Sequence, residues 1–306
     1  MDFSKAFDVV PHRRLLMKLE HLGIRHNINR WIEDFLSNRT QNVIIDGESS
    51  TSSPVFSGVP QGTVLGPLLF LVYINNLPDC VASDVRMFAD DLILYRQINS
   101  HNDCVNLQKD INSLCNWETA WQMRFNKSKC FIMRMTHKKN IPHHAYSMGD
   151  SILQEVKHHP YLGVELSSDL TWSKHINQSV NSANKILGLI KRNFWNCASS
   201  ARETAYKALV RPKLEYASVI WDPHQKIHTE SLEKVQRRAA RFVKNEYSRF
   251  SSVSDMLKDL NWDTLENRRF KARLVTIYKE THGLIPSNIN NLLEEKKNQL
   301  HVNLTV

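Results

Sequence analysis

The 306-residue sequence has few cysteines and no long apolar run. Its five cysteines are odd in number, widely spaced and free of any C-x-x-C pair, which excludes a disulfide framework and a zinc finger. The longest apolar run, residues 64–74, is too short to cross a bilayer, and the N-terminus has no apolar leader segment. We therefore expect an intracellular protein of a reducing compartment, in the nucleus or the cytoplasm, with no membrane partner.

The first half of the chain has no net positive charge, and the basic excess is concentrated in the second half. The whole chain holds 40 Lys+Arg and 31 Asp+Glu, a formal net charge of +9. Residues 1–156 hold 16 basic and 16 acidic side chains, so residues 157–306 hold 40 − 16 = 24 against 31 − 16 = 15. The whole excess lies in the second half, which predicts a polyanionic partner for that half.

Hydrophobic periodicity predicts a mixed first part and a helical second part. Helices are expected at residues 11–22, 28–36, 68–74, 105–121, 173–193, 201–216, 229–245 and 263–281. Strands are expected at residues 41–45 and 131–135, and Asp46-Gly47 is typical of a tight hairpin. A second hairpin, 85–89 with 92–95, carries Asp90-Asp91 at its tip. This order favours a split-βαβ sandwich followed by helices, with a boundary near residue 170.

The Asp90-Asp91 pair is the sharpest local anomaly in the sequence. Adjacent carboxylates repel each other, and two aspartates are a poor choice for both centres of a tight turn. Joined by Asp2, which precedes the strand-like Phe3, they match the carboxylate set that ligates two Mg²⁺ ions in phosphoryl transfer. A solvated acidic turn without a ligand is the alternative for the dipeptide alone.

Four motifs occur in one order along the chain: Asp2–Asp8 (DFSKAFD), Ser57–Pro67 (SGVPQGTVLGP), Phe88–Asp91 (FADD) and Asn126–Lys129 (NKSK). They resemble the palm of reverse transcriptases, and more closely that of LINE-type (non-LTR) retrotransposons. The segment Tyr161–Asp169 with Trp172, and the segment Leu232–Phe242, extend the resemblance to about residue 245. Relatives of telomerase or of group II introns fit the same chemistry but match the second of these segments less well.

The resemblance implies an RNA-directed DNA polymerase with an α+β fold. It implies a palm, with a split-βαβ, ferredoxin-like sheet and helices on one face, followed by a helical thumb. We expect residues 1–172 to form the palm with its primer-grip hairpin, 173–247 the basic thumb, and 248–306 a helical extension. The implied partners are an RNA template, a DNA primer and a dNTP; protein partners are not indicated.

The resemblance also assigns roles to single residues. Asp2, Asp90 and Asp91 would bind two Mg²⁺ ions, with Mn²⁺ as an alternative, and Lys129 would protonate the leaving pyrophosphate. Three further residues would surround the incoming nucleotide: Phe7, Gln61 and Gly62. Each of these assignments has a structural alternative. Phe7 could be an ordinary core aromatic, the glycine-rich loop could be only the start of a helix, and Lys129 could be a solvated surface lysine.

A basic helix is predicted near residues 229–245. Its cationic side chains are Lys234, Arg237, Arg238, Arg241 and Lys244. An apolar stripe on the same helix, Leu232, Val235, Ala239 and Phe242, is expected to pack inward, so that the cations face nucleic-acid phosphates.

The sequence departs from the family pattern at its start, because it begins at the first palm motif. We therefore expect a chain truncated at the N-terminus, without the fingers and with a frayed strand at Asp2. No endonuclease, zinc-knuckle or RNase H motif is recognised. A catalytically inactive retroelement remnant that at most binds nucleic acid is the alternative function.

Overall fold

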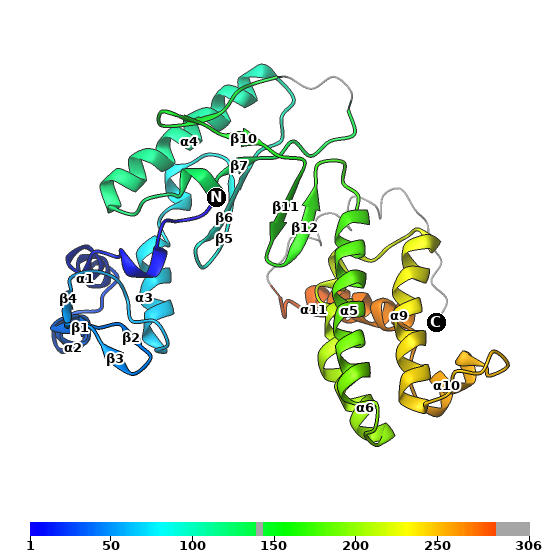
Figure 1. Ribbon diagram of the computed structural model, residues 1–306. Coiled ribbons are helices and arrows are strands. Elements are labelled where there is room, and N and C mark those ends of the chain that lie inside the picture. The colour runs from blue at the N-terminus through cyan, green and yellow to red at the C-terminus, as the bar shows by residue number, and fades with distance from the viewer. Residues whose placement is uncertain (139–142, 286–306) are drawn as a thin grey trace. The chain divides into compact units, whose positions relative to one another are not determined.

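The computed structural model describes residues 1–138 and 143–285 and divides the chain into two compact units, Met1–His158 and His159–Val306 (Figure 1). Each unit has its own hydrophobic core. Helices and small sheets occur together in the first unit, so the predicted mixed α and β class is confirmed. Within the described ranges, none of the helices combines the length and the apolar character that crossing a membrane requires.

The first unit contains four α-helices and several short strands. The helices are α1 (His12–His21), α2 (His26–Leu36), α3 (Leu65–Ile74) and α4 (His101–Trp121), with short 3-10 turns η1 (Ala6–Asp8), η2 (Pro78–Cys80) and η3 (Lys127–Lys129). The strands are β1 (Arg39–Gln41), β2 (Ile44–Ile45), β3 (Glu48–Ser49), β4 (Ser53–Val55), β5 (Asp84–Phe88), β6 (Asp91–Tyr95), β7 (Phe131–Ile132), β8 (Ser147–Met148), β9 (Ser151–Ile152) and β10 (Gln154–Glu155). All four predicted helices are therefore present, with ends shifted by a few residues.

The ladders of the first unit are short, and each joins two strands in the described part of the chain. β1 pairs with β4, β2 with β3, β5 with β6 and β8 with β9, all antiparallel, whereas β7 and β10 are parallel. The predicted turn between β2 and β3 is confirmed, because Asp46 and Gly47 both have the positive φ that this hairpin needs (51° and 89°).

The tip of the β5–β6 hairpin differs by one residue from the expectation. Phe88 pairs with Asp91, so Ala89 and Asp90 are the two turn residues and Asp91 is the first residue of β6. Ala89 adopts a left-handed conformation (φ 50°), which costs energy for a residue with a Cβ. The expectation of two aspartates at the tip is thus wrong for Asp91, because the cross-strand register places it in the ladder.

Aromatic and aliphatic side chains of α3 and α4 form the centre of the first core. Phe70, Tyr73 and Ile74 of α3 are fully buried, because this helix is apolar on every side. Phe3 is buried as well and stacks on Phe125, with ring centroids 4.5 Å apart. This packing fixes the segment that carries Asp2 against the body of the unit.

Lys18 of α1 is a buried cation in this core. Its side chain is 8% exposed, donates hydrogen bonds to the Tyr73 carbonyl and to Asn76 Oδ1, and lies over the Trp121 ring, 3.9 Å from the centroid. Burial lowers the pKa of Lys18 to about 8, and Asp79 opposes this only in part.

Lys18 makes the stability of the first unit depend on pH in a predictable direction. In the folded state its ammonium loses the proton near pH 8, whereas the unfolded chain keeps it until about pH 10.5, so stability rises with pH between these values. We expect the unfolding free energy of the wild type, minus that of Lys18→Met, to increase by roughly 2 kcal/mol from about pH 8 to about pH 10.

The difference between the two chains is the quantity to measure, by urea unfolding at several pH values. The buried thiols of Cys80, Cys115 and Cys130 have raised pKa values and lower the stability of both chains in the same range. A difference that stays flat with pH would show that Lys18 is not buried as described.

The second unit is a hairpin followed by helices. Its elements are β11 (His158–Tyr161), β12 (Val164–Ser167), α5 (Ser173–Asn193), α6 (Ser199–Ala205), a π-helical turn η4 (Tyr206–Val210), α7 (Arg211–Glu215), α8 (Ser218–Trp221), α9 (Lys226–Lys244), α10 (Val253–Asp259) and α11 (Leu265–Thr281). β11 pairs with β12, and α5 packs along both β12 and α9. The hairpin thus belongs by its contacts mainly to the helical unit, whereas the predicted domain boundaries at 172 and 247 stay a prediction.

The predicted helix at residues 201–216 is present as one continuous helical segment, residues 199–215, in which α6, the π-helical turn η4 and α7 follow each other directly. Pro212 has no N–H to donate to the preceding turn, and the backbone widens into the π-helical turn η4 just before α7. The predicted helices at 173–193, 229–245 and 263–281 are present as α5, α9 and α11.

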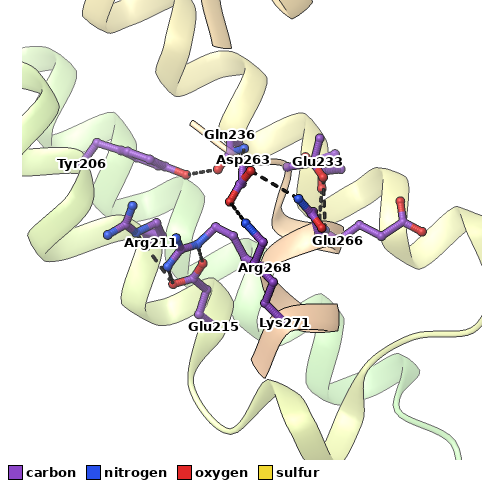
Figure 2. A network of polar contacts seen from close by, with 11 residues as sticks. Tyr206, Arg211, Glu215, Glu233, Gln236, Asp263, Glu266, Arg268 and Lys271 are labelled. Atoms are coloured by element: carbon purple, nitrogen blue, oxygen red, sulfur yellow. Dashed lines mark hydrogen bonds and ion pairs between the residues drawn. The ribbon is translucent and has the colours of Figure 1, made fainter. Parts of the chain in front are cut away.

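A polar network attaches α11 to the rest of the second unit (Figure 2). Arg268 forms an ion pair with Glu215 of α7, and the backbone N–H of Glu266 donates to Glu233 Oε1 of α9 at 2.9 Å. Glu233 is buried, and burial raises the pKa of its carboxyl. These bonds order the start of α11 against α9.

Gln236 is the central amide of the same network. Its Oε1 accepts from the Tyr206 hydroxyl at 2.9 Å, and its Nε2 donates to the Asp263 carbonyl, also at 2.9 Å. Asp263 in turn pairs with Lys271 at 2.7 Å. Both the oxygen and the nitrogen of the buried Gln236 amide therefore have a hydrogen-bond partner, and a buried network whose groups are paired in this way is stabilising.

Candidate active site

The β5–β6 hairpin and the first residues of the chain place two aspartates side by side. Asp2 forms an isolated antiparallel bridge with Asp91, and Phe3 forms one with Phe125. The Met1 ammonium donates to the Leu92 carbonyl at 2.7 Å, and the Leu92 N–H donates to the Met1 carbonyl at 3.1 Å. The segment at Asp2 thus lies between β6 and Phe125 and is joined to each by a single bridge, whereas the expected fraying of this strand stays a prediction.

Lys129 lies directly beside Asp2. Its Nζ is 2.8 Å from Asp2 Oδ2, and the side chains of Lys129 and Asp2 are 64% and 21% exposed. The Asn126 N–H donates to the Asp2 carbonyl at 2.8 Å, which positions η3 next to the carboxylate. The hydrogen bond that the Lys129 ammonium donates to Asp2 raises the pKa of Lys129, and the negative charges of Asp2, Asp90 and Asp91 add to this effect.

The aspartates have the donor chemistry of a magnesium site, although their side chains do not converge as ligands. Within residues 1–138 and 143–285, no three His, Cys, Asp or Glu side chains are grouped so that they could hold one ion. Carboxylate oxygens are nevertheless the ligands that Mg²⁺ prefers. Three carboxylates act on the Lys129 ammonium, so this place already attracts a cation. The residues therefore fit a divalent cation by donor type and by charge.

Phe7, Gln61 and Gly62 lie in the first unit beside the glycine-rich loop. Phe7 is half-buried and stacks on Phe70 with ring centroids 4.5 Å apart. It thus packs on the core, as an ordinary core aromatic would. Gln61 is exposed and its Nε2 donates to Asp8 Oδ1 at 3.0 Å. Gly62 is exposed with φ 76°, a conformation that favours glycine.

Gly58 brings the glycine-rich loop close to the first motif. A Cβ at this position would lie 2.7 Å from the Asp8 Cα, and the Gly58 N–H donates to the Val10 carbonyl at 2.8 Å. The loop and residues 7–10 thereby form one wall of an open cleft of about 660 Å³. The cleft is lined by Lys5, Asp8, Val9, Arg39, Gln41, Pro54, Val55, Phe56, Ser57, Gly58, Val59 and Gln61.

Sequence reasoning missed Lys5 and Arg39, the two cations of this cleft. Lys5 lies inside the first motif and has a left-handed backbone (φ 51°), which the motif alone does not reveal. Arg39 is in β1, far from every motif in the sequence. Only the pairing of β1 with β4 carries Arg39 to the rim of the loop, so no local pattern could have found it.

The basic residues of α9 have unequal surroundings. The predicted stripe is buried, since Leu232, Val235, Ala239 and Phe242 all belong to the second core. Lys234, Arg237 and Arg238 are exposed, and Arg238 Nη1 donates to Asn184 Oδ1 of α5 at 3.0 Å.

Two more of the five predicted cations, besides Arg238, form contacts within the unit. Arg241 donates to the Ser248 carbonyl at 2.9 Å, and Lys244 pairs with Asp259 of α10 at 3.1 Å. The charges most available to a partner on this helix are therefore Lys234 and Arg237.

Comparisons with known proteins show which family the chain belongs to. The sequence profile of the family described as "Reverse transcriptase (RNA-dependent DNA polymerase)" matches residues 1–166, more than half of the chain. The "Probable RNA-directed DNA polymerase from transposon X-element" and the "RNA-directed DNA polymerase from mobile element jockey", both of Drosophila melanogaster, are each 27% identical over 79% of this chain and 28% of their own length.

A third relative extends the similarity into the second unit. The "Probable RNA-directed DNA polymerase from transposon BS" of Drosophila melanogaster is 25% identical over 93% of this chain and 33% of its own length. The chain thus spans about a third or less of the length of each of these three relatives. Because the family profile covers the whole first unit, with both aspartates of its hairpin, the chain belongs to the reverse transcriptase (RNA-dependent DNA polymerase) family and resembles its LINE-type members.

Proposed function

We propose that this chain is the polymerising part of a LINE-type reverse transcriptase, which adds dNTPs to the 3′-hydroxyl of a DNA primer on an RNA template. The observation that carries the proposal is the grouping of Asp2, Asp91 and Lys129. Asp2 forms a backbone bridge with Asp91 and an ion pair with Lys129 at 2.8 Å, although Asp91 and Lys129 follow Asp2 in the sequence by 91 − 2 = 89 and 129 − 2 = 127 positions.

Asp2, Asp90 and Asp91 would hold the divalent ions in this proposal. Two bound Mg²⁺ or Mn²⁺ ions would activate the primer hydroxyl and stabilise the leaving pyrophosphate. Lys129 lies within hydrogen-bond reach of the same place and is exposed, so its ammonium is available to donate a proton to the pyrophosphate. The pairing with Asp2 also orients Lys129.

The incoming dNTP would occupy the cleft beside the glycine-rich loop. Phe7 would lie below the sugar, and Gln61 with Gly62 would contact the nucleotide through an amide and an exposed backbone. Lys5 and Arg39 add positive charge to the cleft and would attract the triphosphate. The stacking of Phe7 on Phe70 gives the ring a fixed position, which a steric contact with the sugar requires.

The finer architecture belongs to the same proposal. Residues 1–172 would act as a palm whose ferredoxin-like sheet is reduced to the β5–β6 hairpin and the bridges at Asp2 and Phe3. Residues 173–247 would act as the thumb, and 248–306 as a C-terminal extension. The excess of positive charge in the second half supports a role in nucleic-acid binding.

The basic face of α9 gives this role a measurable salt dependence. We expect Lys234→Ala and Arg237→Ala each to lower the slope of log K against log salt concentration, for an RNA–DNA hybrid, by about 1. Lys244→Ala is the matched control on the same helix, because its ammonium is paired with Asp259. Equal slopes for all three variants and the parent, in anisotropy titrations at several salt concentrations, would contradict contact between this face and phosphates.

Extension of a labelled DNA primer on an RNA template tests the proposed activity. The purified chain is expected to lengthen the primer with the complementary dNTP and Mg²⁺ or Mn²⁺, and to stop when the metal is chelated. Binding of the hybrid without any dNTP addition, with either metal, would overturn the proposal.

A further inference from the structure

At one end of the α5–α9 helix pair, a single arginine side chain joins the turn after α5 to the C-terminal end of α9. Arg202 of α6 donates from Nη2 to the Trp195 carbonyl at 2.7 Å and from Nη1 to the Phe242 carbonyl at 3.1 Å. Ser199 Oγ donates to the Val243 carbonyl at 3.0 Å. The turn after α5 is therefore fixed beside the C-terminal end of α9, and this end also carries the loop that precedes α10 (Figure 1).

Three aromatic side chains at this end are exposed to solvent. Trp195 is 69% exposed, Tyr247 55% and Phe250 100%. Rings of this size contribute most to stability when they are buried, so three exposed rings at one place suggest a partner.

The loop that carries two of these rings is held in place by hydrogen bonds. Arg241 of α9 donates to the Ser248 carbonyl at 2.9 Å and to the Ser251 carbonyl at 3.4 Å. The Phe250 N–H donates to Ser248 Oγ at 3.2 Å. The loop is thus a defined structure that turns Phe250 outward.

The charges around the rings are mostly positive. Lys191 Nζ lies 5.8 Å from the centroid of the Tyr247 ring, and Arg249 is exposed next to Phe250. Burial lowers the pKa of Lys191, and the positive charge of the nearby Arg238 lowers it further. A bound anion would oppose both effects, because it stabilises the charged ammonium.

The acidic groups at this end are engaged within the unit. Glu246 accepts from the Ser248 N–H at 2.8 Å and lies near Arg241. Asp259 and Asp255 of α10 pair with Lys244 and Lys258. Residues 185–252 hold 14 basic and 6 acidic side chains, so the surroundings as a whole attract a polyanion.

We propose that Trp195, Tyr247 and Phe250 form a stacking platform for single-stranded nucleic acid. Unpaired bases stack on the rings, and Lys191 and Arg249 contact the phosphates between them. Exposed rings beside cations are the combination that binds single strands without reading their sequence, because every base has a face to stack and only unpaired bases present it. The inference deepens the proposed function, on which it rests, by placing unpaired template or displaced strand at this end of the second unit.

Binding of a fluorescein-labelled, 12-nucleotide single-stranded RNA to the full chain tests the platform. We expect Phe250→Ala and Trp195→Ala each to weaken binding by about 5- to 150-fold, and Phe250→Trp to retain the parent affinity. Trp31→Ala is the matched control, since Trp31 of α2 is also an exposed aromatic but belongs to the first unit and lies outside the cleft beside the glycine-rich loop. The affinity for a blunt RNA–DNA hybrid is expected to stay within about 2-fold of the parent in every variant.

Two results would overturn the platform. One is single-strand binding that is unchanged by both alanine variants. The other is a loss of binding to anionic phospholipid vesicles in the same variants with RNA binding intact, which would assign the rings to a membrane surface. Primer extension by the parent chain separates the two proposals. Extension by the parent, with single-strand binding unaffected in both alanine variants, removes the platform alone. Ring-dependent single-strand binding, with no extension by the parent, removes the polymerase activity alone.

Discussion

Replacing Asp90 with asparagine is expected to lower the rate of dNTP addition by about 10³-fold or more. The substitution keeps the shape of the side chain and removes one negative charge beside Asp2 and Asp91, which metal-assisted displacement needs. The change leaves the core intact, because Asp90 is a turn residue outside the β5–β6 ladder. The measurement is single-turnover extension at saturating dNTP.

Asp84→Asn is the matched control for this experiment. Asp84 is an exposed aspartate of the same hairpin, opposite Tyr95 at the far end from the tip, so its variant is expected to extend the primer like the parent. Undiminished extension by Asp90→Asn would show that the tip carboxylate has no part in the reaction.

Replacing Asp222 with alanine is expected to cause the largest loss of stability in the second unit. Asp222 follows α8, accepts a hydrogen bond from Arg269 Nε at 2.6 Å and forms an ion pair with Arg273, whose Nε lies 3.1 Å from Oδ2. Arg269 is 1% exposed, and among the described residues its Nη1 and Nη2 have no hydrogen-bond partner, so its charge depends on the ion pair with Asp222 and on the negative charge of the buried Glu233. Removing one partner of a buried ion pair costs about 3–5 kcal/mol.

The thermal midpoint of the second unit should fall by about 10 °C in the Asp222→Ala chain. The double variant Asp222→Ala, Arg269→Met is expected to recover much of this loss, because it removes the unpaired charge and keeps apolar volume. Lys258→Ala, which breaks an exposed pair with Asp255, should leave the midpoint nearly unchanged. Equal midpoints for the Asp222 single variant and this control would contradict a buried Arg269.

Much of the fold was predictable because its local patterns are strong. The helix at residues 173–193 is amphipathic throughout, and its predicted ends agree with α5. The hairpin at Asp46-Gly47 follows from residues that tolerate positive φ. The failures occur where tertiary structure overrides local preference. Ala89, rather than an aspartate, takes the left-handed position, and the helix that apolar spacing predicts at 201–216 contains a π-helical turn just before Pro212.

The candidate site was predictable only in part, for the same reason. The order of the motifs brings Asp2, Asp91 and Lys129 into one hypothesis, and the described contacts place these residues together. The hydrogen bonds of Arg241 and the ion pair of Lys244 depend on residues up to 15 positions away, beyond the reach of helical periodicity. Arg39 reaches its cleft through strand pairing, which the sequence does not specify.

Binding of Mn²⁺ tests most directly the central claim that Asp2, Asp90 and Asp91 form a divalent-cation site. The titration, followed by the electron paramagnetic resonance of free Mn²⁺, would use the full chain with a dideoxy-terminated primer, an RNA template and the next dNTP, so that no turnover occurs. We predict tight binding by the parent and by Asp84→Asn, and at least about 10-fold weaker binding by Asp2→Asn and Asp90→Asn. The same affinity in all four chains would contradict the account.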